Sequence, residues 1–209
     1  MNGAEQKSAN HNNSITSVVL IYHRGFVFEK EKIMTDIFVT GSRNDCEIEA
    51  LIKNRLSENY TITYIKQDHY LKIGEGYNLI VLESEKPVIN VCGSILLMKE
   101  NGTIPDTLPE DITAIVNSDN EQQLLAVQKT GIKAITCGTS SKSTISFSSE
   151  TDDYLLISLN RSITALSGKK IQPLEIPVEK GEAERYSLMS YTALRLILDD
   201  FNSELGKLI

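Results

Sequence analysis

The chain has 209 residues, a length that favours a single domain, and its 21 Lys and Arg against 28 Asp and Glu leave a formal net charge of -7. An acidic chain has no general attraction for the phosphates of nucleic acids or for anionic lipids, so we expect neither nucleic acid nor a membrane as a partner. Hydrophobic residues make up 41% and charged residues 23% of the sequence, which is ordinary globular composition and excludes wholesale disorder.

Cysteine usage and the N-terminal sequence favour a cytoplasmic location. Cys46, Cys92 and Cys137 form no CxxC pair, and the histidines add no zinc-binding spacing, so we expect neither a metal nor a disulfide. Cys92 and Cys137 lie in apolar runs, which predicts small core residues. Residues 1–14 are polar and lack the apolar run of a signal peptide, which predicts a flexible tail before one domain at 15–209. No apolar run approaches the ~20 residues of a membrane span.

The first two thirds of the chain alternate between β-branched apolar runs and helical patterns. The predicted strands are Ser17–Tyr22, Gly25–Phe28, Ile37–Thr40, Thr61–Ile65, Tyr77–Leu82, Ile112–Val116 and Ile132–Cys137, with a further apolar run at Val88–Met98. A helix is predicted from Asp45 to Leu56, with Asn44 and Glu47 as its capping pair. Another is capped by Ser118 and Glu121, continues through Lys129 and stops at Gly131.

The last third reads as antiparallel strands followed by one helix. Strands are predicted at Tyr154–Asn160, Ile163–Leu166 and Ile171–Val178, with a hairpin turn at Gly168. An amphipathic helix is predicted from about Ala183 to Leu205, with one apolar face. The fold expected from this order is α/β, with a mainly parallel sheet, helices on both faces, and a C-terminal β meander and helix.

Four strand ends carry a resemblance to a known family. They are the Thr-Gly that closes Ile37–Ser42, the acidic end of Tyr77–Glu83, the Asn-x-Asp of Ile115–Asp119 and the final Gly of Gly131–Gly138. From about residue 37 to 205 this layout resembles the central ATPase domain of the Mur ligase family, which includes folylpolyglutamate synthetase and cyanophycin synthetase. The resemblance implies a phosphate loop after the first strand, an acidic strand end that serves magnesium, and an Asn-x-Asp-Asp element on the nucleotide side.

The loop departs from the pattern that the resemblance implies, which is Gly-Thr-x-Gly-Lys-Thr/Ser. The aligned stretch runs Gly41, Ser42, Arg43, Asn44, Asp45 and Cys46, so the second Gly, the Lys and the metal-binding hydroxyl are all replaced. A carboxylate in place of the Lys repels a phosphate, by roughly 4 kcal/mol for unit charges about 4 Å apart at an effective dielectric of about 20. Asn120 also departs from the Asn-x-Asp-Asp element, and the chain has no room for the family's flanking domains. Ligase or hydrolytic activity by the family mechanism is therefore not expected.

The candidate ligand-binding residues lie at the carboxyl ends of the predicted strands, where open α/β sheets bind ligands. They are Gly41, Ser42, Arg43, Asn44, Glu83, Asn117 and Asp119. Each has a structural alternative: Gly41 as a tight turn, the residues after it as a helix cap, and Glu83 as a solvated carboxylate. The sequence points to no catalytic residue.

Two functions follow from these residues. The first is a non-catalytic binding or interaction module, a degenerate Mur-ligase-like core that serves a protein partner or senses a small molecule. It needs no cofactor, and ATP with magnesium is disfavoured. The alternative is an ATP-dependent amide-bond ligase fragment or an NTPase with an unusual phosphate loop, which the retained Glu83 and Asn117-x-Asp119 favour. The sequence leaves the ligand, the partner and the oligomeric state open.

Overall fold

The structure is a computed structural model that describes residues 34–152, 154–179 and 183–200. All of these belong to the unit formed by residues 31–209. The predicted tail at 1–14 and the predicted strands Ser17–Tyr22 and Gly25–Phe28 lie outside the described residues and stay predictions.

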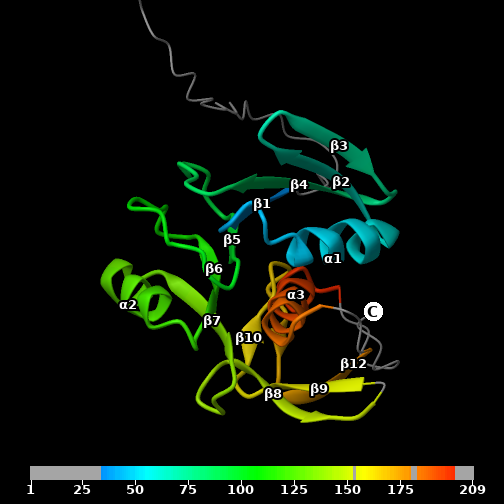
Figure 1. The fold of residues 1–209 in the computed structure, drawn as a ribbon, viewed down its shortest axis with the longest axis vertical. Helices are drawn as coiled ribbons and strands as arrows, with labels where there is room; N and C mark the ends of the chain where they lie inside the picture. The colour runs from blue at the N-terminus through cyan, green and yellow to red at the C-terminus, as the bar shows by residue number, and fades with distance from the viewer. Residues whose placement is uncertain (1–33, 153, 180–182, 201–209) are drawn as a thin grey trace, which may run out of the picture. The chain divides into compact units, whose positions relative to one another are not determined.

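The described residues form strands, three α-helices and one 3₁₀ turn, shown in Figure 1. The strands are β1 (Thr35–Thr40), β2 (Tyr60–Lys66), β3 (His69–Ile73), β4 (Tyr77–Ser84), β5 (Ile95–Met98), β6 (Thr113–Asn117), β7 (Lys133–Gly138), β8 (Ile145–Glu150), β9 (Tyr154–Leu159), β10 (Ile163–Thr164), β11 (Lys170–Ile171) and β12 (Leu174–Glu179). The helices are α1 (Glu47–Arg55), the 3₁₀ turn η1 (Leu56–Glu58), α2 (Glu121–Thr130) and α3 (Arg185–Ile197).

Ten of these strands form one sheet in the order β12-β9-β8-β7-β6-β5-β1-β4-β2-β3. The strands from β8 to β2 in this order run parallel, whereas β3 pairs antiparallel with β2, and β9 pairs antiparallel with both β8 and β12. The four strands predicted to share a sheet, now β1, β4, β6 and β7, do so. The predicted fold class, a mainly parallel α/β sheet with a C-terminal meander and helix, is confirmed.

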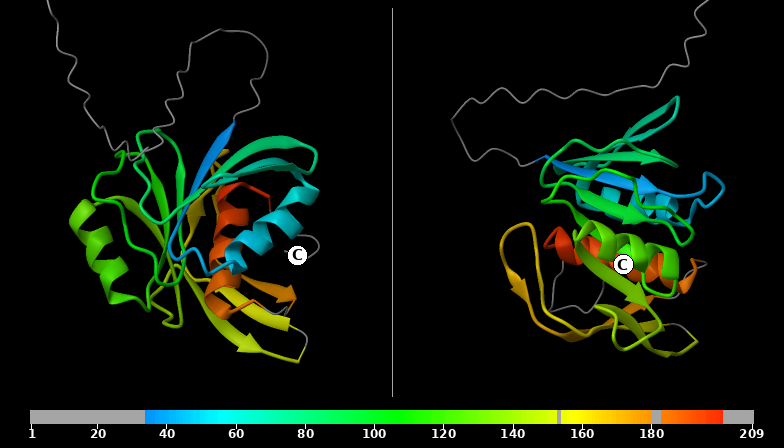
Figure 2. Two further views of the ribbon diagram at one scale, coloured as in Figure 1. Left: turned by 45° about the horizontal axis from the view of Figure 1, so that its top comes forward. Right: turned by 90° about the vertical axis from the view of Figure 1, so that its left-hand side faces the viewer.

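Helices cover both faces of the sheet (Figure 2). On one face α1 contributes Ile48, Leu51 and Ile52 to the larger core, into which α3 also packs. On the other face Val127 of α2 packs with a smaller core around Phe38 and Leu96. Each central strand therefore buries side chains on both faces, which explains the continuous apolar runs in its sequence.

Helix α3 is buried on all sides rather than on one. Twelve of its 13 residues, Tyr186 to Ile197, are buried, and it contacts α1, β6, β7 and β8. Figure 1 shows the sheet curling around it, so the helix has no solvent face. Its polar groups are bonded internally: the Tyr186 hydroxyl donates to Met98 O at 2.6 Å and Thr192 Oγ1 to Leu188 O at 2.8 Å. The predicted one-sided helix was wrong in this respect.

Several predicted boundaries were also wrong. The strand β3, His69–Ile73, was not among the predicted strands. The run Val88–Met98 forms a strand only from Ile95, and Cys92 in its loop portion is exposed, although Cys137 is buried as predicted.

The predicted caps differ from the observed ones because capping depends on local geometry. Cys46, not Asn44, is the N-cap of α1, and it makes no side-chain capping bond. Asn120, not Ser118, caps α2, where its Oδ1 accepts from Gln122 N at 3.0 Å and Gln123 N at 3.3 Å. The predicted stop of α2 at Gly131, which has φ of 67°, is confirmed.

Replacing Asn120 by Ala tests its capping role. We expect the free energy of unfolding to fall by about 1 kcal/mol, because two amide N–H groups of the first turn lose their acceptor. Asn101→Ala, at an exposed position in the turn after β5, is the matched control and should change stability by less than about 0.5 kcal/mol. Urea denaturation measures both, and equal stability of the two variants would contradict the assignment.

Candidate functional site

The carboxyl edge of the parallel strands next to β1 is the candidate site. β1 lies between β4 and β5. The chain first builds the strands on one side of β1, ending with β4, and then crosses to the other side with β5. In open α/β sheets such a reversal of strand order is where ligands bind. The groups that meet there are the loop Gly41–Cys46 after β1, Glu83 of β4 and Lys99 directly after β5.

The Lys99 side chain fills the inside of this loop. Its side chain has no exposed surface, and Nζ lies 2.8 Å from Glu83 Oε1. The same ammonium donates to the carbonyl oxygen of Ser42 at 2.9 Å and to that of Asp45. An ammonium has three N–H donors, so these three oxygens satisfy it completely. The loop therefore presents oxygen atoms to a cation, whereas a phosphate loop presents N–H groups to an anion.

Gly41 is required by the close approach of Lys99. Its φ is 145°, and a Cβ atom added there would lie 2.6 Å from Lys99 Cβ. Non-bonded carbon atoms essentially never come this close, so a side chain at position 41 would force Lys99 to shift. Gly41 was considered both as a ligand-binding residue and as a structural one, and its contact with Lys99 favours the structural role.

Three of the loop amides are bonded within the loop itself. Asn44 N donates to Ser42 Oγ at 3.3 Å, Asp45 N to Ser42 O at 3.3 Å and Glu47 N to Asp45 Oδ1 at 3.3 Å. These N–H groups are therefore not free to face an anion at the start of α1. The Glu47 carboxylate itself accepts from Glu184 N, the N-cap residue of α3, at 2.8 Å.

Glu83 is buried and shared by three donors. Its side chain is 3% exposed, and Oε1 lies 2.8 Å from both Lys99 Nζ and Lys66 Nζ. Its Oε2 accepts from the Tyr64 hydroxyl. The strand register explains this meeting, because Lys66 of β2 pairs directly with Glu83 of β4. The solvated-carboxylate alternative for Glu83 is therefore wrong, since every oxygen of the carboxylate is bonded inside the protein.

The charges continue outward along α1. Lys66 Nζ also lies 2.6 Å from Glu49, which in turn pairs with Lys53. Partial burial lowers the pKa of Lys66, but hydrogen bonds to Glu49 and Glu83 outweigh it and raise that pKa. Burial and then the hydrogen bond to Glu83 raise the pKa of Tyr64. Lys53, Glu49, Lys66, Glu83 and Lys99 thus form a chain of alternating charge, here called the lysine–glutamate network.

The remaining predicted residues lie at the end of β6 and organise the turn into α2. Asn117 Oδ1 accepts from Asp119 N at 2.8 Å, and Asp119 Oδ2 accepts from Thr139 N at 2.9 Å. Gln123 joins this turn to the network, because its Oε1 accepts from Asn117 N and its Nε2 donates to Lys99 O at 3.0 Å. Asn117 and Asp119 therefore act here as backbone supports.

The structure thus separates the predicted site residues into three groups. Gly41, Ser42 and Glu83 meet around Lys99, while Asn117 and Asp119 form the adjacent turn. Arg43 and Asn44 lie at the exposed rim, where Arg43 Nε is 3.4 Å from Glu85. Sequence reasoning missed Lys99, Lys66, Tyr64 and Gln123. The sequence signal for the two lysines was that each one ends an apolar strand, Lys66 in YTITYIK and Lys99 in ILLMK.

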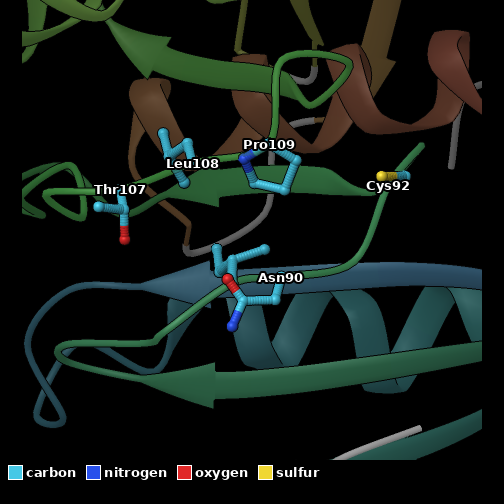
Figure 3. A pocket seen from close by; sticks show the side chains of 6 residues that line it. Asn90, Cys92, Thr107, Leu108 and Pro109 are labelled. Atoms are coloured by element: carbon cyan, nitrogen blue, oxygen red, sulfur yellow. The ribbon is translucent and has the colours of Figure 1, made fainter. Parts of the chain in front are cut away.

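A second concavity lies apart from the network, on the face of the smaller core. It has a volume of about 260 Å³ and is lined by Ile89, Asn90, Cys92, Thr107, Leu108 and Pro109. Figure 3 shows Asn90 on one segment and Leu108 and Pro109 on the facing segment. None of its lining residues belongs to the network or to the predicted site.

Within the described residues, no three His, Cys, Asp or Glu side chains are grouped so that they could hold a metal ion. None of the helices in the described part of the chain is both long and apolar enough to cross a membrane.

No family model and no curated protein matches this sequence. Among solved structures, one similar to it is that of a UDP-N-acetylmuramoyl-L-alanyl-D-glutamate–2,6-diaminopimelate ligase, at 10% identity and a TM-score of 0.47. The match covers 81% of this chain and 44% of that ligase chain, so this chain spans less than half of its length. This structural neighbour is a Mur ligase, the family that the sequence resembles.

Replacing Lys99 by Met removes the ammonium and keeps an unbranched apolar side chain. We expect the free energy of unfolding to fall by about 3–5 kcal/mol, the usual cost of breaking a buried ion pair from one side. Lys142→Met, at an exposed position, is the control and should change stability by less than about 0.5 kcal/mol. A small loss for Lys99→Met in urea denaturation would show that the loop does not depend on this ammonium.

The raised pKa values of Lys66 and Tyr64 predict loss of stability at alkaline pH. Above a pH of about 10, where both groups lose their protons in the unfolded chain, the folded state retains protons that the unfolded state has released. The free energy of unfolding should therefore fall as pH rises, by up to about 1.4 kcal/mol per pH unit for each group.

Urea denaturation between pH 8 and 11 measures this slope. In Tyr64→Phe one titrating group is absent, so its slope above pH 10 should be shallower than that of the unmodified chain. Identical slopes for the two proteins would contradict the role assigned to Tyr64.

Proposed function

We propose that this chain is a non-catalytic binding or interaction module, in which the position of a phosphate loop is closed by the chain's own lysine. The observation that carries the proposal is the Lys99 ammonium inside the loop, bonded to Ser42 O, Asp45 O and Glu83 Oε1. A triphosphate in this place would have to displace a fully buried cation from three oxygen atoms. It would then face the carbonyl groups of Ser42 and Asp45, while the amides of Asn44, Asp45 and Glu47 are already bonded within the loop.

The charge around the loop also opposes an anionic ligand. Burial and then the neighbouring carboxylates of Glu184, Asp45 and Glu47 raise the pKa of Glu100. The three carboxylates beside Glu100 give a negative field at the edge of the sheet next to the loop. The field of the α1 N-terminus, worth about 0.3–1 kcal/mol for an anion, is small by comparison with like-charge repulsion at contact distance. The site therefore suits an uncharged small molecule or a protein surface better than a nucleotide.

The alternative function is that of an ATP-dependent amide-bond ligase fragment or an NTPase with an unusual loop. The observation in its favour is that two ammonium groups, Lys99 and Lys66, lie beside Glu83 at the point where the strand order reverses. In that alternative Lys99 turns towards the phosphates and releases Glu83 to a magnesium ion. The two functions make opposite predictions for ATP binding.

Thermal unfolding of the full chain with and without Mg–ATP tests the proposal. We expect no change in melting temperature and no phosphate release, because the loop interior is occupied. If the chain bound Mg–ATP, a concentration of about 100 times the dissociation constant would add about 2.7 kcal/mol of stability. This would raise the melting temperature by several degrees for a chain of this size. Tight Mg–ATP binding that Glu83→Ala weakens would establish the alternative function.

The double variant Asn44→Gly with Asp45→Lys tests the same site from the other direction. It replaces a carboxylate of the loop by an ammonium, so we expect nucleotide affinity to rise by at least about tenfold, or about 1.4 kcal/mol. Asp152→Lys, which makes the same charge change in the exposed turn between β8 and β9, should leave affinity unchanged. Equal affinities of both variants in calorimetry would contradict the assignment of this loop.

A further inference from the structure

The two chain segments that connect β4 to β5 and β5 to β6 contain no helix. They are residues 85–94 and 99–112, and the structure describes both completely. Parallel strands are usually connected through a helix. Here two irregular segments cover this part of the smaller core instead, and the concavity of about 260 Å³ lies between them (Figure 3). Its six lining residues all belong to these two segments.

The concavity has an apolar floor and a polar mouth. Ile89 is 1% exposed and belongs to the smaller core, against which Leu108 also packs. The mouth is formed by three exposed residues, Asn90, Cys92 and Thr107. Val88, the neighbour of Ile89 along the chain, is 73% exposed, the highest value among the large apolar side chains of the described residues. An apolar contact surface is therefore offered both inside and beside the concavity.

The size of the concavity fits one side chain better than a whole small molecule. Pockets that enclose drug-sized ligands measure about 300–1,000 Å³. This one measures about 260 Å³, and three of its six lining residues are exposed. Protein interfaces are commonly anchored by a few side chains that each enter a pocket on the partner. The geometry thus favours a protein segment that is anchored by one apolar side chain.

Carboxylates beside the concavity determine which charge a partner should carry. Asp106 precedes the lining residues 107–109, and Glu110 and Asp111 follow them directly. Asp111 also approaches the other segment, since a Cβ atom on Gly93 would lie 4.0 Å from its Oδ2. These three carboxylates are exposed and form no ion pair with another described residue. The two segments together carry five carboxylates and two lysines, so basic groups next to the anchor would be attracted.

We propose that this concavity is a docking site for a segment of a partner protein, in which one apolar side chain enters between Lys or Arg residues. The apolar side chain would pack on Ile89 and Leu108, and the basic side chains would face Asp106, Glu110 and Asp111. Because these carboxylates are exposed to water, they govern the choice of partner and the rate of association more than the affinity. The concavity is separate from the lysine–glutamate network, so the inference goes beyond the proposed function and does not depend on it.

The reactivity of Cys92 reports whether the concavity is occupied. Cys92 lies at its mouth, Cys46 is exposed in the loop after β1, and Cys137 is buried. The full chain is treated with iodoacetamide, and mass spectrometry follows the rate of labelling at each cysteine. We expect millimolar Lys-Lys-Phe-Lys-Lys peptide to slow the labelling of Cys92 by at least about threefold and to leave that of Cys46 unchanged. Lys-Lys-Ser-Lys-Lys, which lacks the anchor, and Glu-Glu-Phe-Glu-Glu, which has the opposite charge, should give no protection.

Charge reversal of the rim tests the choice of partner. In the double variant Asp106→Lys with Glu110→Lys, the basic peptide should no longer protect Cys92, and Glu-Glu-Phe-Glu-Glu should protect it instead. Asp152→Lys makes the same kind of charge change in the exposed turn between β8 and β9 and should keep the original preference. Thermal unfolding should show that each variant retains the fold.

Three outcomes would overturn the proposal. The first is that the basic peptide gives no protection of Cys92 at concentrations up to about 10 mM. The second is equal protection by all three peptides, or equal protection of Cys46 and Cys92, which would show a general attraction to the acidic chain. The third is an unchanged peptide preference in the charge-reversed variant.

Discussion

The arrangement of the carboxyl ends of the parallel strands next to β1 depends on the contact between the Lys99 ammonium and the Glu83 carboxylate. Burying either charge alone would cost several kcal/mol, so each needs the other together with further hydrogen bonds. Lys99 obtains them from the carbonyls of Ser42 and Asp45, and Glu83 obtains them from Lys66 and Tyr64. These requirements join the end of β5 to the loop after β1 and to the ends of β4 and β2. Gly41 is part of the same constraint, because only a residue without Cβ admits the Lys99 side chain.

Such a network contributes more to the choice of one arrangement than to net stability. Desolvation offsets most of the attraction between buried charges, while an unmatched charge is strongly destabilising. Lys66 and Glu83 pair only in the observed register of β2 and β4. A shift of either strand by one residue would move one of the two to the other face. The network therefore penalises wrong registers near the β3 edge of a sheet whose β-branched apolar strands could otherwise slip.

The sequence predicted the strands and helices that depend on local pattern, but not the contacts that depend on tertiary packing. Apolar runs identified β1, β4, β6 and β7, and Gly131 identified the end of α2, because strand burial and a left-handed helix stop leave a local signature. Glu47 has a local pattern typical of a capping box, yet its carboxylate bonds to Glu184, 137 residues away. Lys99 looks like an ordinary charged residue after an apolar strand. Its complete burial follows from a loop, a helix and a second strand that no short window of sequence contains.

The identity of residue 45 and the position of Lys99 are physically linked. In the phosphate loop that the family resemblance implies, a lysine at this place points out of the loop towards a phosphate. Here the residue is Asp45, and an ammonium reaches the loop from β5 and points inward, towards Glu83. A lysine at position 45 would bring a second ammonium close to Lys99, and two unit charges about 4 Å apart repel by roughly 4 kcal/mol at an effective dielectric of about 20. In this chain the inward cation occupies the loop alone, and an outward one would need an anion beside it to offset this repulsion.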